Sequence, residues 1–179
     1  MNREDRDDVD GAEPTQPIEP TIVPDINAVN FEARLRYPYL LDVEVVQSAA
    51  VNRPYFTGIR GIFAVPPGQH PSARVIWHEL GHEAVAIASI WREAREGRGV
   101  AGEEIFDDFA AIVGLPPRAL TDADSPFFRL RQEYIADAFL LANTGEVPLY
   151  PETLRDLPAL DAVTLRAFFA QMHLRMTVA

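Results

Sequence analysis

The chain has 179 residues, of which 47% are hydrophobic, and this is enough to fill the core of a single domain. It carries 27 acidic residues against 16 lysines and arginines, and the formal net charge of −11 argues against nucleic acid and anionic membrane surfaces as partners. The sequence contains no cysteine, which excludes disulfide bonds and thiolate metal sites, so a metal would need histidine and acidic ligands.

The first segment, residues 1 to 24, combines acidic side chains with four prolines. Such a composition buries little apolar surface, so we expect a solvated tail ahead of one domain spanning residues 25 to 179. We find neither a secretory signal nor an apolar run long enough to cross a bilayer. These features predict a cytoplasmic protein by default and leave open export without a signal or incorporation into an assembly.

A small sheet is expected before the first long helix. The pattern admits a short helix from Asn30 to Arg36. Leu41 to Gln47 alternates and is rich in β-branched residues, which predicts a strand. Tyr55 to Val65 predicts a second strand, closed by the Pro-Pro-Gly turn at residues 66 to 68.

Four helices are predicted after the sheet. They run from Pro71 or Ser72 to Gly97 or Gly99, from Glu103 to Val113, from Pro126 to Ala142, and from Ala162 to about Met176. Asn143 and Gly145 suit the left-handed cap of the third helix, and Asp161 suits the N-cap of the fourth. An apolar stripe on the fourth helix predicts a core face made of Leu165, Phe168, Phe169, Met172 and Met176. The predicted fold class is therefore α+β and mostly helical.

A metal-binding motif lies inside the first long helix. Residues 78 to 82 read His-Glu-Leu-Gly-His, which puts His78 and His82 one helical turn apart on the same face, where they can share an ion. Zinc takes four ligands, and a catalytic zinc leaves one position to water. The two histidines therefore need a third protein ligand from elsewhere in the chain.

The third predicted helix offers two acidic side chains, Glu133 and Asp137, four residues apart on one face of an apolar segment. Burying an unpaired carboxylate carries a large desolvation penalty, so a cation or a donor should lie opposite. Pairing with Arg129 or Arg131 at a solvated edge is one alternative. We favour Glu133 as the third metal ligand and Asp137 as the acceptor of the outer ring N–H of His78; the reverse assignment stays open.

The two motifs resemble those of gluzincin zinc metallopeptidases, which pair His-Glu-x-x-His with a downstream Glu-x-x-x-Asp helix. The match covers Trp77 to Glu83 and Glu133 to Phe139. From His82 to Glu133 is 133 minus 82, or 51 residues. This interval resembles that of the anthrax lethal factor catalytic domain and its Pro-Pro endopeptidase relatives. The ImmA/IrrE peptidases, which cleave bacterial repressors and have a shorter spacer, are the second resemblance.

The resemblance implies a zincin-like domain that acts as a zinc-dependent endopeptidase. Zn²⁺ would be bound by His78, His82 and Glu133, and Glu79 would be the general base for a metal-activated water. The alternative is a zincin-fold structural or interaction module of a larger assembly, without physiological turnover.

The resemblance also implies an extended protein or peptide substrate, added as a strand to a sheet edge along Gly58 to Val65. The lethal factor group stabilises the oxyanion with a tyrosine shortly before the glutamate ligand, where this chain has Ser125 to Phe128. Substitutes for that tyrosine are Tyr55, Tyr150 and His70, and none is assigned. Candidate walls of a specificity pocket, each expected to be ordinary core instead, are Trp77, Trp91, Phe127 and Phe128.

Overall fold

A computed structural model describes residues 24–52, 54–56, 62–96, 101–146, 149, 157 and 160–177. The side chains of residues 24–25, 55–56, 91–96, 101–103 and 173–177 are outside this description, as is the predicted tail up to residue 23. The elements are α1 (Pro24–Arg36), β1 (Glu44–Gln47), β2 (Tyr55–Phe56), β3 (Ile62–Val65), α2 (Ala73–Glu96), α3 (Ala101–Ile112), the 3₁₀ turn η2 (Phe128–Leu130), α4 (Arg131–Thr144) and α6 (Ala162–Thr177). The predicted class, α+β and mostly helical with a small sheet before the first long helix, is confirmed.

The sheet has three strands in the order β1-β3-β2. Strand β1 runs parallel to β3, with Glu44 opposite Ile62, and β2 runs antiparallel to β3, with Tyr55 opposite Ala64. The prediction of one strand from Tyr55 to Val65 is therefore wrong, because the segment contains two strands that pair with each other. The sheet edge predicted along Gly58 to Val65 is wrong for Ile62–Val65, since β3 is the central strand of the described sheet, and residues 58 to 61 lie outside the described residues.

Helix α1 begins at Pro24, six residues before the predicted start at Asn30. Proline suits the first helical position because its missing N–H would have no partner there. A buried stripe then recurs at helical spacing and faces the core through Ile26, Val29, Ala33 and Tyr37.

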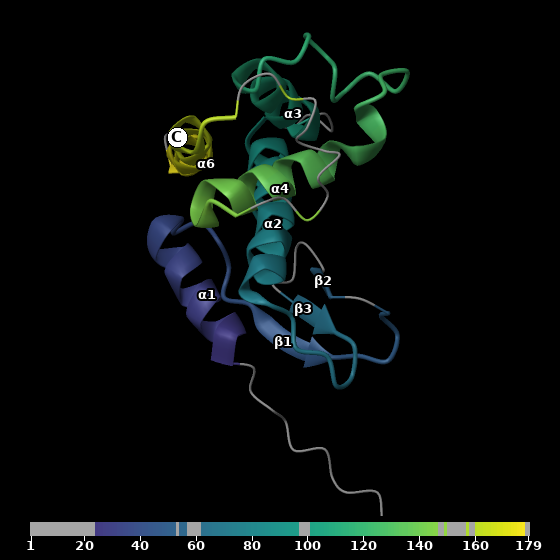
Figure 1. Ribbon diagram of the computed structural model, residues 1–179. Helices are drawn as coiled ribbons and strands as arrows, with labels where there is room; N and C mark the ends of the chain where they lie inside the picture. The colour runs from purple at the N-terminus through teal and green to yellow at the C-terminus, as the bar shows by residue number, and fades with distance from the viewer. Residues whose placement is uncertain are drawn as a thin grey trace, which may run out of the picture.

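Helix α2 is the central element of the domain (Figure 1). Helix α4 crosses it and makes its most extensive contact, α1 lies beside its first half, the sheet lies at its N-terminal end, and α3 packs against it farther along (Figure 1). Ser72, one of the two predicted starting residues, caps α2, because its Oγ accepts the backbone N–H of Val75 at 3.4 Å.

Aromatic side chains fill the core where α1, α2, α4 and α6 meet. The ring of Phe139 on α4 lies 5.0 Å from that of Tyr37, 5.9 Å from that of Trp77 and 4.8 Å from that of Phe169. The predicted core face of α6 is confirmed for four of its five residues, which are Leu165, Phe168, Phe169 and Met172. The fifth, Met176, lies outside the described side chains.

The predicted caps at Gly145 and Asp161 are confirmed, whereas the one at Asn143 is wrong, and α4 begins at Arg131 and not at the predicted Pro126. Gly145 closes α4 in the left-handed conformation with φ of 70°, and its N–H donates to the Leu141 carbonyl. Asn143 remains helical, and its buried side chain donates to the Phe139 carbonyl and accepts from the Tyr37 hydroxyl. Asp161 caps α6 by accepting the Thr164 N–H at 2.8 Å, and the hydrogen bond from the Thr164 hydroxyl, together with that from its N–H, lowers the pKa of Asp161.

Candidate metal centre

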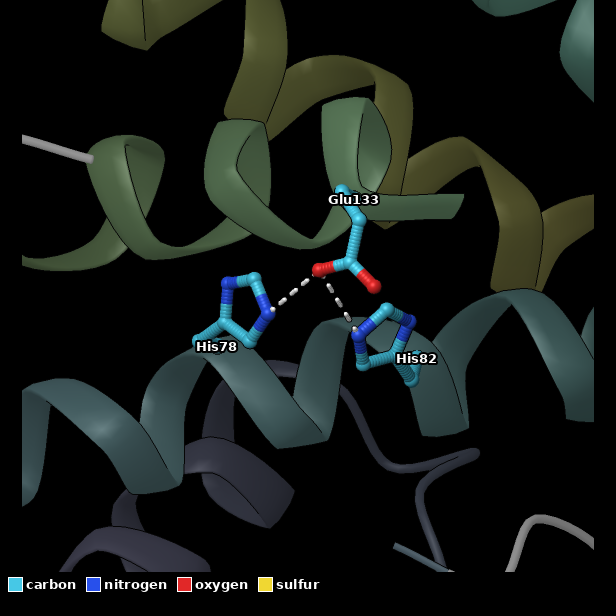
Figure 2. A group of neighbouring side chains, drawn as sticks. All are labelled: His78, His82 and Glu133. Carbon is cyan, nitrogen blue, oxygen red and sulfur yellow. Dashed lines mark hydrogen bonds and ion pairs between the residues drawn. The ribbon is translucent and has the colours of Figure 1, made fainter. Parts of the chain in front are cut away.

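The structure brings His78 and His82 on α2 together with Glu133 in the first turn of α4 (Figure 2). The Oε2 atom of Glu133 lies 3.1 Å from the Nε2 of His78 and 3.6 Å from the Nε2 of His82. One donor atom from each of the three residues falls within 4.8 Å of the other two. The two segments that the sequence predicted to supply the ligands are 51 positions apart, and they meet at one point.

The donor set suits a metal ion by both chemistry and spacing. Imidazole nitrogen and carboxylate oxygen are common ligands of zinc, and tetrahedral bonds near 2.0–2.1 Å would separate two ligand atoms by roughly 3.3 Å. The two separations that involve Glu133, 3.1 and 3.6 Å, bracket that value. The His78, His82 and Glu133 group could therefore hold a metal ion.

Asp137 lies on α4 one turn after Glu133 and contacts the other side of the His78 ring. Its Oδ1 is 2.8 Å from His78 Nδ1 and also accepts the backbone N–H of Leu149 at 3.0 Å. When Nδ1 of His78 donates to this carboxylate, the ring is held with Nε2 on the side of Glu133. This is the contact predicted for Asp137, whereas the Leu149 bond has no signal in the sequence.

The charges of this group are strongly coupled. Burial alone would lower the pKa of His78, but its hydrogen bonds to Asp137 and Glu133, together with the nearby charge of Glu79, raise that pKa to about 9. Hydrogen bonds from His78 and His82 hold the pKa of Glu133 well below its usual range. Without a metal, the site therefore keeps an ionised carboxylate against a protonated imidazole at neutral pH.

Access to the group is one-sided. The His78 side chain is only 2% exposed, while those of His82 and Glu133 are 21% and 25% exposed. Glu79 is half-buried on α2, directly after His78. A molecule from solvent would therefore reach the group past His82 and Glu133.

The alternative in which Arg129 or Arg131 pairs with the acids of α4 is wrong. The guanidinium of Arg131 lies 3.9 Å from the centre of the Phe128 ring and 5.5 Å from that of Phe106, and Arg129 is exposed. The acids instead contact the histidines of α2.

A buried acid directly follows His82, and sequence reasoning missed it. Glu83 is fully buried, and its Oε1 accepts the backbone N–H of Leu41 at 2.8 Å. Its Oε2 has no hydrogen-bond partner in the described part of the chain. Burial raises the pKa of Glu83 to about 7, against the opposing effects of the Leu41 N–H and the charge of Arg34. The signal in the sequence that could have identified Glu83 is an acidic residue on the apolar face of a helix.

The structure places only some of the other candidate residues. His70 is exposed in the loop before α2, while Tyr150 and the side chain of Tyr55 lie outside the described residues. Trp77 is buried, as expected for core. Phe127 and Phe128 are half-buried, and the side chain of Trp91 is not described.

In the described residues, no helix combines the length and apolar character that crossing a membrane requires. No protein-family model matches the chain, and no curated protein or solved structure is significantly similar to it.

Proposed function

We propose that the chain is a zinc-dependent endopeptidase. The observation that carries this proposal is the convergence of His78, His82 and Glu133 from two helices, with one side of the group open to solvent. Two imidazoles and one carboxylate leave a fourth position free, as in catalytic rather than structural zinc sites. The resemblance to the gluzincin motifs is consistent with the same ligand set.

The roles of the residues follow from their chemistry. Zinc held by such a set would supply an acidified water, with a pKa near 7, and a Lewis acid for a carbonyl oxygen. Asp137 contacts the Nδ1 side of the His78 ring, which would leave Nε2 for the ion. Glu79 would be the general base that takes a proton from the water and passes it to the departing amine.

The sheet edge expected to bind the substrate must be changed, because β3 pairs with β1 on one side and with β2 on the other. Strand β2 pairs only with β3 among the described residues, and it contacts α2, the helix that carries both histidines. A substrate in extended conformation would add to the β2 side of the sheet, with backbone hydrogen bonds holding the chain across the site. This proposal replaces the edge predicted along Gly58 to Val65.

Metal analysis of the purified protein tests the ligand set. We expect about one zinc per chain in the wild type, and loss of that zinc in His78→Ala and in Glu133→Ala. Gln132→Ala is a matched control, because Gln132 is exposed and precedes Glu133 on α4. Its zinc content should equal that of the wild type.

Turnover separates the peptidase from a zinc-bearing structural module. Glu79→Gln should keep its zinc and lose cleavage of a broad peptide library that the wild type hydrolyses. Equal inactivity of both proteins with stoichiometric zinc would overturn the peptidase proposal and favour the structural module. Absence of zinc from the wild type would remove the basis of both.

A further inference from the structure

Gly81 lies in the middle of α2, between His78 and His82. Glycine is unfavourable in a helix interior because the flexible unfolded backbone loses more entropy than that of alanine. Nothing about α2 as an isolated helix explains a glycine at this position. The reason must come from what packs against it.

The neighbour is the backbone of α4. A Cβ atom on residue 81 would lie 2.7 Å from the Cα of Ala136 and 3.1 Å from its carbonyl oxygen, and 2.9 Å from the Cβ of Phe139. Real Cβ atoms essentially never come closer than 3.0 Å to such atoms, and ordinary contacts begin near 3.4 Å. The atoms in the way belong to main chain and to a buried ring residue, so they cannot rotate aside.

This contact is adjacent to the candidate metal centre on both helices. Gly81 directly precedes His82, and Ala136 follows Glu133 by three residues, less than one turn of α4. The closest approach of the two backbones therefore lies beside the place where the carboxylate meets the imidazoles. The distance between the two helices at Gly81 therefore determines how far the Glu133 side chain must extend to meet the histidines of α2.

We infer that Gly81 is a positioning residue for the metal centre: the missing side chain lets α4 approach α2 closely enough for Glu133 to share an ion with His78 and His82. The inference rests on the proposed function. A methyl group at residue 81 would have to move Ala136 by 3.4 minus 2.7, or 0.7 Å, to restore ordinary contact. That displacement exceeds the tolerance of about 0.2 Å for metal–ligand distances.

Cobalt titration of Gly81→Ala tests the inference without relying on activity. Co²⁺ bound by wild type, Gly81→Ala and Glu133→Ala is followed by its visible absorption, which depends on the number and geometry of ligands. We expect Gly81→Ala to bind Co²⁺ at least about tenfold more weakly than wild type, with a spectrum shifted toward that of Glu133→Ala. The same affinity and spectrum as wild type would overturn the inference.

One further variant and one further measurement separate positioning from general destabilisation. Leu165→Ala opens the core on α6, away from the contact, so it should lower the midpoint of thermal unfolding and leave Co²⁺ affinity unchanged. If Gly81→Ala does not fold in buffer, its Co²⁺ titration is repeated in an osmolyte such as trimethylamine oxide, which favours the folded state, and we expect weaker binding than that of the wild type in the same solution. Binding equal to that of the wild type in the osmolyte would overturn the inference.

Thermal unfolding without metal gives an independent readout. If Gly81 had no close neighbour, alanine would raise the unfolding midpoint through its better helix propensity. The contact with Ala136 predicts a lower midpoint instead. A wild type that binds no Co²⁺ would overturn the proposed function together with this inference, whereas normal wild-type binding with an unaffected Gly81→Ala overturns the inference alone.

Discussion

Asp137 and His78 stand on different helices, and the Oδ1 atom of Asp137 lies 2.8 Å from the Nδ1 atom of His78. Asp137→Asn keeps the size of the side chain and removes its charge. We expect zinc affinity to fall by about 10- to 100-fold, because the His78 ring is no longer oriented and polarised by a carboxylate. Competition with a chelator of known affinity measures the change.

The same variant should lower the pKa of His78 in the metal-free protein from its value of about 9, since Asp137 is the strongest of the groups that raise it. NMR titration of the imidazole resonances reports that pKa. Glu146→Gln, an exposed acid just after α4, is the control with the same change of charge. A His78 pKa that stays the same in Asp137→Asn would contradict this reading of the contact.

Zinc binding should release protons. At pH 7 the pKa of about 9 keeps His78 protonated in the metal-free protein, and a metal needs that nitrogen unprotonated. We therefore expect release of about one proton per zinc, and an apparent zinc affinity that rises with pH until it levels off near pH 9. Calorimetry in buffers with different ionisation enthalpies counts the protons.

Removing the metal should also lower stability. A ligand that binds only the folded chain adds about 2.7 kcal/mol to the free energy of unfolding when its free concentration is 100 times Kd. Chelation should therefore lower the midpoint of thermal unfolding in the wild type and leave His78→Ala unchanged. Equal midpoints of the wild type with and without zinc would contradict the ligand set.

Glu83 makes stability depend on pH. Its pKa in the folded protein is about 7, above the ordinary value of 4.5, so the folded state binds the proton more tightly than the unfolded state. The stabilising contribution is fully present below pH 4.5 and is lost as pH rises through about 7. The difference amounts to about 3 kcal/mol.

Glu83→Gln removes this titration and keeps an oxygen for the Leu41 N–H. We expect the free energy of unfolding of metal-free Glu83→Gln, relative to metal-free wild type, to increase between pH 5 and pH 8. Urea titrations at these two pH values measure it. The opposite sign of the difference would show that an ionised Glu83 is matched by a charge such as Arg34.

Asn143 should contribute to stability as a buried hydrogen-bonding residue. Asn143→Ala removes the acceptor of the Tyr37 hydroxyl and of the Arg36 guanidinium, both at 3.1 Å. Leaving the buried Tyr37 hydroxyl without a partner costs about 1–3 kcal/mol of the free energy of unfolding. Thr144→Ala, whose hydroxyl is only part-buried, is the neighbouring control and should cost less in the same denaturation experiment.

The sequence predicted helix ends well where a residue caps the helix locally, whereas the start of α4, which has no side-chain cap, lies at Arg131 and not at the predicted Pro126. Ser72, Asp161 and Gly145 act as caps through local bonds, and local bonds are visible in local sequence. The start of α1 was missed because Pro24 was grouped with the prolines of the tail. Asn143 was misassigned because two of its partners, Arg36 and Tyr37, lie more than 100 residues earlier in the chain.

The ligand set was accessible from sequence because helical spacing fixes which side chains share a face. The pairing of Glu133 with the histidines of α2 is long-range, but Glu133 and Asp137 share one face of an apolar helix, where unpaired acids are costly, and this singled them out as candidates. The sheet was less accessible, since nothing within Tyr55 to Val65 revealed that two of its parts pair with each other. Gly81 and Glu83 were overlooked, since their roles depend on what packs against α2.

At both ends of α4, nearby side chains carry the charge that the helix dipole favours. Glu133 lies in its first turn, where free N–H groups carry partial positive charge. At the other end, Arg36 donates to the carbonyl of Asn143 and Arg166 donates to that of Ala142, where partial negative charge collects. The helix dipole thus favours an anionic Glu133 before any cation arrives, so this carboxylate is prepared for an ion by the polarity of the helix that presents it.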